Sequence, residues 1–315
     1  MFGQQTPRRQ FLRQFLLLIL LLAGAAWVVE MRREGDERNR YPAPGLILVQ
    51  GQRRIHIDCE GAVRAGMPAV ILEAGAGESH LAWTAVQAAL TPHTRVCSYD
   101  RPGYGWSDPA PGPRTATAMA EEVHDLLPQA GVTAPYVLVG QGLGSVVSQR
   151  YAQLYPEQVV GLVLVAPPDT SALVVQPEPV RAAMVQVERL PEAAARVLAP
   201  FGGMRWLIRA GAIGDYGKLP EDVRAPARAL AYRAQTWRTA LAEMGAMGEN
   251  ALALVEEAEG LPPVPVTVIV PAGKRSPLFV REMTVVEGPV ADEDLHVVRP
   301  GLVVEAVREM MGNRK

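Results

Sequence analysis

The chain has 315 residues, of which 49% are hydrophobic and 20% charged, and its formal net charge is −2. This composition is typical of a packed protein and excludes an intrinsically disordered chain. Because there is no basic excess and the Lys and Arg residues are scattered, nucleic-acid binding is disfavoured. Two cysteines are too few for a disulfide scaffold, and none of the five histidines is spaced as a metal ligand. We therefore expect neither a metal nor another cofactor.

An unbroken apolar run from Phe15 to Val29 lies near the N-terminus, behind the basic residues Arg8, Arg9 and Arg13. Counted from Phe11, the run is long enough to cross a bilayer, which takes roughly 17–25 residues. A buried helix of the fold is the alternative, but no amphipathic pattern favours it. We expect residues 1–30 to be a transmembrane anchor or an export signal.

Two features of the same segment favour export. The string around Arg8-Arg9 resembles a twin-arginine signal, although Pro7 stands where that pattern prefers Ser or Thr. Ala23-Gly24-Ala25 offers a small-x-small cleavage site, so removal of the segment stays open. We expect the following domain on the extracytoplasmic side of the membrane, although further arginines after the segment blur the charge rule for orientation.

A linker is predicted at residues 31–45, charged as far as Arg40 and proline-rich from Tyr41 to Gly45. Short β-rich runs follow, and Gly51-Gln52 is typical of a hairpin turn. Strands are predicted at Leu46–Gln50, Arg54–Cys59, Val70–Ala74, Val96–Asp100, Tyr136–Gly140, Val160–Ala166, Val264–Val270 and Met283–Glu287. Helices are predicted at Leu81–Leu90, Ala116–Gln129, Ser145–Tyr155 and Leu302–Met311. Such alternation predicts an α/β domain over residues 46–315 with a mainly parallel sheet.

Between residues 170 and 262 the strand pattern stops. The segment is rich in alanine and helical in period, which predicts a helical cap inserted into the α/β domain. Its aromatic residues are interpreted as core packing.

The string Val137-Leu-Val-Gly-Gln-Gly-Leu-Gly-Ser145 joins a buried strand to a helix through a glycine-rich turn. This arrangement is typical of the nucleophile elbow, G-x-S-x-G, which holds a serine above the sheet. Gly140 and Gly144 take the framing positions, and Gly142 stands at the centre. A dinucleotide site is disfavoured, because the string does not fit G-x-G-x-x-G and no acidic residue ends the next strand.

Several stretches together resemble the membrane-anchored α/β-hydrolase-fold proteins of bacteria, within the ester-hydrolase and lipase-like superfamily. The matching stretches, in family order, are Tyr41–Gly45, Leu72-Glu-Ala-Gly-Ala-Gly77, Cys97-Ser-Tyr-Asp-Arg-Pro-Gly-Tyr-Gly-Trp-Ser-Asp108, Pro135–Gly140 and Tyr155-Pro156 with Gly161–Val165. The resemblance implies an α/β-hydrolase fold with an eight-stranded type of sheet, an N-terminal antiparallel hairpin and a cap. It says less about function, which depends on the site.

In such hydrolases a serine attacks, a histidine takes its proton and an acid orients the histidine. The resemblance places Gly142 at the serine position and Glu293 at the histidine position, seven residues before Pro300. His296 is a possible displaced base, although a surface residue is the favoured interpretation. No carboxylate stands at the acid positions, and Asp169 nearby is expected to cap a helix.

The oxyanion donors are the part of the machinery that the resemblance retains, as the backbone N–H groups of Ala76 and Leu143. Asp100 and Arg101 are expected to brace a loop, and Ser107 to form a turn. Ser145 is conceivable as a displaced nucleophile, but packing in the first helical turn is favoured. Glu73 and Glu78 flank the oxyanion loop and could act as bases, although solvation or a loop hydrogen bond is commoner.

The resemblance also implies that the second strand lies antiparallel beside the fourth, which would bring Cys59 and Cys97 together. Cross-strand neighbours have Cβ atoms about 4.5–5.5 Å apart, close to the spacing of a disulfide. We expect proximity, and a bond if the compartment is oxidising.

Three functions follow from these observations. The first is a catalytically degraded hydrolase that binds a small apolar or acyl ligand in the former active site and attaches to the membrane through its N-terminal helix. The second is an active carboxylic-ester hydrolase with a displaced nucleophile or a mechanism that needs none. The third is a structural or partner-binding protein with the cap as the interface, and the sequence names no partner.

Overall fold

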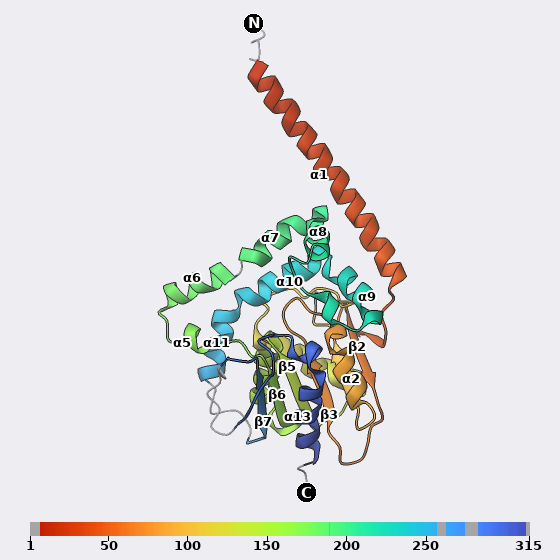
Figure 1. The fold of residues 1–315 in the computed structure, drawn as a ribbon, viewed down its shortest axis with the longest axis vertical. Helices are drawn as coiled ribbons and strands as arrows, with labels where there is room; N and C mark the ends of the chain where they lie inside the picture. Colours follow the sequence, from red (N-terminus) through yellow and green to blue (C-terminus); the bar gives the residue numbers. More distant parts are fainter. Residues whose placement is uncertain (1–6, 189, 257–262, 275–282, 313–315) are drawn as a thin grey trace.

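The computed structural model describes residues 7–188, 190–256, 263–274 and 283–312. An eight-stranded sheet forms the centre, with the strand order β1-β2-β4-β3-β5-β6-β7-β8. Helices cover both faces of the sheet, more helices lie over one edge, and the long helix α1 projects away from the domain (Figure 1).

The strands are β1 (Leu46–Gln50), β2 (Arg53–Glu60), β3 (Ala69–Glu73), β4 (Val96–Tyr99), β5 (Tyr136–Gln141), β6 (Val159–Val165), β7 (Val266–Val270) and β8 (Thr284–Glu287). β1 and β2 form an antiparallel hairpin in which Gln50 pairs with Arg53, so Gly51 and Gln52 make the turn as predicted. β2 is also antiparallel to β4, and the remaining pairs are parallel. The predicted α/β-hydrolase fold class is confirmed.

The helices that pack on the sheet are α2 (Thr84–Leu90), α3 (Ala116–Gln129), α4 (Leu143–Leu154), α12 (Leu295–Val298) and α13 (Pro300–Gly312), and a 3₁₀ turn η1 (His80–Trp83) precedes α2. Alternate residues of each strand face opposite sides, as the pleat requires. Ile71 and Leu138 therefore join the core under α3 and α4, whereas Leu72 and Val139 join the core under α2 and α13.

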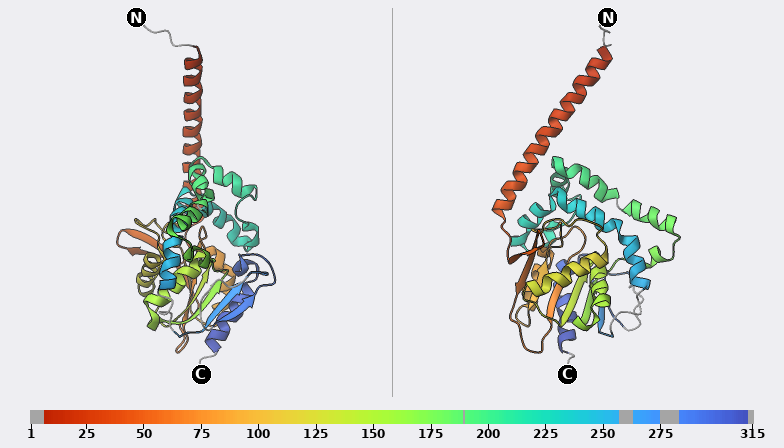
Figure 2. Two further views of the ribbon diagram at one scale, coloured as in Figure 1. Left: turned by 90° about the vertical axis from the view of Figure 1, so that its left-hand side faces the viewer. Right: turned by 180° about the vertical axis from the view of Figure 1, so that it is seen from behind.

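A helical cap separates β6 from β7 and lies over the edge where the parallel strands end (Figures 1 and 2). Its elements are α5 (Ser171–Val174), α6 (Glu178–Glu188), α7 (Leu190–Leu198), η3 (Ala199–Phe201), α8 (Gly203–Arg209), η4 (Tyr216–Lys218), α9 (Glu221–Ala231), α10 (Ala234–Gly245) and α11 (Met247–Glu256). The predicted end of the cap, near residue 262, lies outside the described residues.

Helix α1 (Pro7–Arg40) is longer than the sequence indicated. Residues 31–40 were expected to be a solvated linker, but they continue the helix, so this expectation is wrong. The physical reason is a buried ion pair with the cap: the Arg205 guanidinium bonds the carboxylates of Glu30, at 2.6 Å, and Glu37. Within the described residues, the segment Gln10–Arg40 has the length and apolar composition of a membrane-crossing helix.

The proline-rich stretch after α1 is irregular but fixed to the domain. The Trp106 indole donates to the Tyr41 carbonyl at 3.0 Å, and the His56 ring bonds the Pro44 carbonyl at 2.6 Å. The stretch therefore ties α1 to the sheet.

Cys59 and Cys97 are directly opposite each other in the β2–β4 pair and form a disulfide, with their Cα atoms 4.1 Å apart. Both the expected proximity and the bond are confirmed.

Candidate functional site

The turn between β5 and α4 has the backbone of a strained elbow. Gly142 precedes α4 with φ 52° and ψ −121°, and its N–H donates to the Val165 carbonyl at 3.0 Å. A side chain on Gly140 would collide with the Gly144 carbonyl, so this framing position requires glycine. A Cβ atom on Gly142 would meet only the Gly75 Cα atom, at 4.0 Å. The tip of the elbow therefore has room for a side chain but carries none.

The loop after β3 packs against this elbow and holds the first expected oxyanion donor. Arg101 donates to the carbonyls of Ala74 and Gly75, the latter at 2.9 Å, which fixes the backbone of the loop. Ala76, the next residue after Gly75, lines a cavity. Leu143, the second expected donor, is the first residue of α4, where a helix leaves its N–H groups without intrahelical partners.

Ser145 is buried in the first turn of α4, as expected. Its hydroxyl donates to the Gly140 carbonyl at 2.8 Å, and its exposed fraction is 0%. A ligand in the cavity therefore has no access to this hydroxyl.

His296 differs from the sequence interpretation, because the side chain is completely buried and not on the surface. Its Nε2 atom is 3.5 Å from the Glu78 carboxylate, and its ring lies 4.6 Å from that of Trp83. The interpretation failed because Trp83 and Glu78 lie more than two hundred residues earlier in the chain. Glu293, at the position that the resemblance assigned to the base, is exposed.

Glu78 is the acidic residue that joins this histidine to the loop. Its carboxylate accepts the Gly75 N–H at 3.1 Å. Burial opposes ionisation, but the His296 ring and the Gly75 N–H outweigh it and lower the pKa of Glu78. Glu78 is therefore a carboxylate at neutral pH. The sequence indicated a loop hydrogen bond for this residue but not the histidine partner.

A buried charge network connects the loop to the cap. Arg101 bonds Glu73 at 2.6 Å and, through two nitrogens, Glu243 of α10 at 3.0 Å. Burial opposes the charge on Arg101, but Glu243 and Glu73 raise its pKa well above the ordinary value. Burial raises the pKa of Glu73, whose carboxylate also accepts the Tyr99 hydroxyl. Glu73 and Arg101 therefore brace the site.

His56, His80 and Asp100 form a second buried cluster, and Asp100 directly precedes Arg101 in the chain. The Nδ1 atoms of His56 and His80 lie 2.9 Å and 3.2 Å from the Asp100 carboxylate. Their donor atoms could surround a metal ion. However, the two nitrogens of His56 already face Asp100 and the Pro44 carbonyl, which favours a charged ring in an ion pair over a ligand. Ser107 completes the cluster by donating to the Asp100 carbonyl at 2.6 Å.

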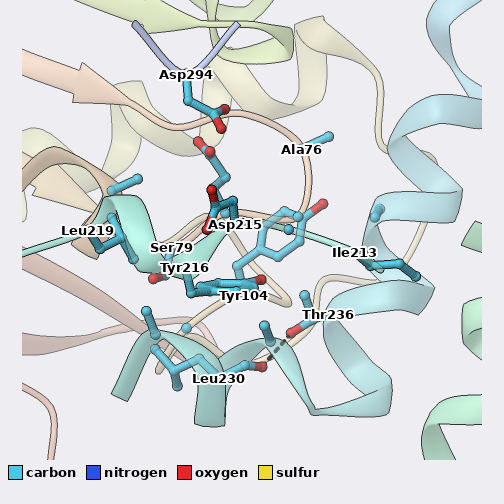
Figure 3. A pocket seen from close by; sticks show the side chains of 18 of the residues that line it. Ala76, Ser79, Tyr104, Ile213, Asp215, Tyr216, Leu219, Leu230, Thr236 and Asp294 are labelled. Atoms are coloured by element: carbon cyan, nitrogen blue, oxygen red, sulfur yellow. Dashed lines mark hydrogen bonds between the residues drawn. The ribbon is translucent and has the colours of Figure 1, made fainter. Parts of the chain in front are cut away.

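A cavity of about 260 Å³ lies between the loop after β3 and the cap. Its apolar wall comes mainly from the cap (Figure 3), and its acidic groups are Glu78 of the loop after β3, Asp215 of the cap and Asp294 before α12. The lining includes Ala76, Glu78, Tyr104, Ile213, Asp215, Tyr216, Leu219, Leu230, Trp237 and Asp294. Tyr216 and Trp237 were interpreted as core residues, and only the position of the cap over the loop reveals that they border the cavity.

The only described lysine of the lining is neutralised. Lys218 bonds Asp292 at 2.8 Å and Asp294 at 3.1 Å. Since Glu78, Asp215 and Asp294 surround the same space, the cavity presents apolar and acidic groups to a ligand.

The strand order, the elbow and the inserted cap define an α/β-hydrolase architecture. The profile of the α/β hydrolase fold family matches residues 68–240, more than half of the chain, and the protein belongs to this family.

Two curated relatives match parts of the chain. A protein of Hormonema carpetanum named "Probable transporter efuK" is 37% identical over 126 residues, 38% of this chain and 18% of the relative. An "AB hydrolase superfamily protein" of Gibberella zeae is 36% identical over 102 residues, 31% of this chain and 32% of the relative. The chain therefore matches about a third or less of the length of these relatives.

Among solved structures, the enol-lactonase from Burkholderia xenovorans LB400 superimposes with a TM-score of 0.62. The alignment covers 85% of this chain and all of that enzyme, with 18% identity. A likeness at this identity concerns the fold alone.

Proposed function

We propose that the protein is a catalytically degraded hydrolase, anchored to a membrane by α1, that binds a small apolar or acyl ligand in the cavity beneath the cap. The observation that carries this proposal is Gly142, a residue without a side chain at the tip of an otherwise preserved elbow. Loss of the nucleophile alone removes about six orders of magnitude of the rate in serine hydrolases. Binding is the property that remains.

The two candidate positions for the catalytic base also favour binding over catalysis. Glu293 is exposed, and His296 is buried between Trp83 and Glu78. A general base needs to reach the proton that it removes, directly or through one water. His296 faces a carboxylate and an indole in place of a serine.

The chemistry of the cavity disfavours a negatively charged ligand. Glu78, Asp215 and Asp294 would repel a free carboxylate, and Lys218 is already paired. The volume lies just below the roughly 300–1,000 Å³ of drug-sized sites. A short ester or another small apolar compound fits both conditions.

The second candidate is an enzyme that uses Glu78 as its base together with the oxyanion amides. Glu78 lines the cavity, which favours this possibility. However, the lowered pKa of Glu78, caused by His296 and the Gly75 N–H against the effect of burial, makes its carboxylate a weak base at neutral pH. Binding without turnover is therefore the better proposal.

Titration of the purified protein with a fluorescent short-chain ester tests the binding site. We expect saturable binding without hydrolysis, and weaker binding for Ile213→Trp, which narrows the cavity. Ala212→Trp is the matched control, because Ala212 is the neighbouring exposed residue and lies outside the lining. Equal affinities for these two variants would place the ligand elsewhere.

A fluorophosphonate probe for reactive serines separates binding from catalysis. Specific labelling that disappears in Ser145→Ala, or turnover that disappears in Glu78→Gln, would replace the proposal with the enzymatic alternative.

The side of the membrane on which the domain lies is tested with Pro42→Cys, since Pro42 is exposed just after α1. A membrane-impermeant maleimide should label it in intact cells, and labelling only after lysis would place the domain in the cytoplasm.

A further inference from the structure

Helix α1 contacts the cap along one stripe that begins inside its apolar run. Glu30 is 2% exposed, and Ala23 and Ala26, on the same face of the helix, are partly covered. α1 packs on η3, and Glu30 lies against Gly202 at the start of α8. Two views show α8 beside the C-terminal part of α1 (Figures 1 and 2).

The length of the apolar run fixes the depth of this contact. From Phe11 to Val29 the helix rises about 28 Å, close to the hydrocarbon thickness of about 30 Å. If the segment from Ala23 onward stayed outside the bilayer, Phe11–Leu22 would cover only about 18 Å. The run therefore spans a bilayer only if the part of the cap beside Ala23 and Ala26 lies at the depth of the lipid.

The outer surface of the cap has the composition that this depth requires. We define the outer cap face by Val187, Leu190, Val197, Phe201 and Trp206, which are 65%, 64%, 65%, 48% and 71% exposed. Leu190, Val197 and Phe201 follow one another at helical spacing, while Ala195 and Ala199 turn inward. Large apolar side chains gathered on a surface mark an interaction site.

The charged and aromatic residues on and beside the outer cap face favour lipid as the binding partner of this face. Trp206 follows directly after Arg205, which holds Glu30 at the end of the apolar run, and tryptophan is enriched at the membrane–water interface. Arg196 and Arg209 are exposed on the same helices and can meet anionic headgroups. In Figure 1 the helices α6 and α7 run across the direction of α1, as elements lying along a bilayer surface would.

We propose that the outer cap face inserts into the headgroup and upper acyl region of the lipid bilayer that α1 crosses. This inference rests on the proposed membrane anchor. It makes the cap an interfacial element, with its apolar face embedded roughly 5–10 Å, as in monotopic amphipathic helices.

The experiment uses the full chain in phosphatidylcholine–phosphatidylglycerol vesicles. Both native cysteines are in a disulfide, so one added cysteine carries a polarity-sensitive fluorophore without competition. Trp206→Cys and Val197→Cys report on the outer cap face. Val63→Cys is the matched control, since Val63 is 74% exposed and precedes β3 at the opposite edge of the sheet. These exposed sites make few contacts, so the substitutions should leave the fold intact.

We expect blue-shifted emission at positions 206 and 197, and several-fold stronger quenching by brominated lipids than at position 63. Leu20→Cys, in the middle of α1, reports on the anchor itself. Quenching at position 20 but not at 197 and 206 would overturn the inference and leave the anchor intact. No quenching at position 20 would reject the anchor and the inference with it. A blue shift at 206 without lipid quenching would indicate burial against a second copy of this chain, and would also overturn the inference.

Discussion

At the residue scale, glycine at position 142 changes the energetics of the elbow as well as its chemistry. Residues with side chains in such backbone regions cost about 1–3 kcal/mol, and active enzymes retain them for the exposed nucleophile. Gly142, with φ 52°, avoids this cost. In the degraded hydrolase that we propose, loss of the nucleophile and relief of strain therefore occur together.

We predict that Gly142→Ser lowers the free energy of unfolding by about 1–3 kcal/mol and produces no esterase activity. The space at this position accepts a Cβ atom, so the loss reports backbone strain and not a collision. Gly142→Ala is the matched control, with the same strain and no hydroxyl. Denaturation and ester turnover are measured for both, and turnover that appears in the serine variant alone would contradict the prediction.

His56 should make stability depend on pH above 6.5. Burial opposes its charge, but Asp100 and the Pro44 carbonyl raise its pKa above the ordinary 6.5. A raised pKa in the folded state gives stability that is complete below pH 6.5 and is lost as the pH rises through the folded value. Burial likewise opposes the charge of Asp100, but the two histidines lower its pKa well below 3.8, so its contribution is lost only in acid.

Urea denaturation of the wild type and of His56→Gln between pH 6 and pH 9 measures this effect. We expect the wild type to lose stability across the range and the variant to show a flatter profile. His93→Gln, at a half-exposed position without such an ion pair, should keep the wild-type slope. Parallel slopes for the wild type and His56→Gln would assign the pH dependence to another group.

At the scale of elements, the strands and the elbow could be predicted from the sequence because their signals are local. Apolar runs such as Val137–Val139 and the glycines that follow them specify a buried strand and a tight turn. The continuation of α1 to Arg40 could not be predicted from the sequence, because Arg205, which pairs with Glu30, lies 175 residues away. Without this partner, charged residues around Gly35 are typical of a solvated linker.

We predict that Arg205→Ala separates α1 from the cap without unfolding the sheet. The substitution leaves the buried Glu30 carboxylate with only the largely exposed Arg33, 3.9 Å away, and breaking a buried pair costs about 3–5 kcal/mol. Hydrogen exchange should accelerate in α8 and in the C-terminal turns of α1, but not in β5 or β6. Arg209→Ala, one turn later and exposed, should leave exchange unchanged. Equal protection of α8 in both variants would show that other contacts hold the helix.

The disulfide between β2 and β4 should contribute strongly to stability. It closes a loop of 38 residues, for which the loss of chain entropy in the unfolded state corresponds to about 4 kcal/mol. Reductant in a denaturation experiment should lower the stability of the wild type but not of the double variant Cys59→Ser, Cys97→Ser. A wild type that responds to reductant no more than this variant would contradict the prediction.

At the scale of the whole molecule, the fold class follows from the order of strands and helices, whereas the site depends on long-range packing. Glu78 and His296 meet across the domain, and Arg101 meets Glu243 of the cap, 142 residues away. Neither pairing has a local signature. The sequence therefore predicted the position of the elbow, but not the buried partners that shape the cavity.

The ion pair between Arg205 and Glu30 has a consequence for how occupancy is measured. If α1 crosses a membrane as proposed, this ion pair holds the cavity at a constant height above the bilayer, and the dose of a strongly lipid-soluble ligand is then its mole fraction in lipid. Diluting vesicles at a constant ligand-to-lipid ratio should then leave the cavity filled, while adding empty vesicles should drain it. A ligand that stays mainly in bulk water would show the opposite pattern: it would leave the cavity on dilution and remain bound when empty vesicles are added.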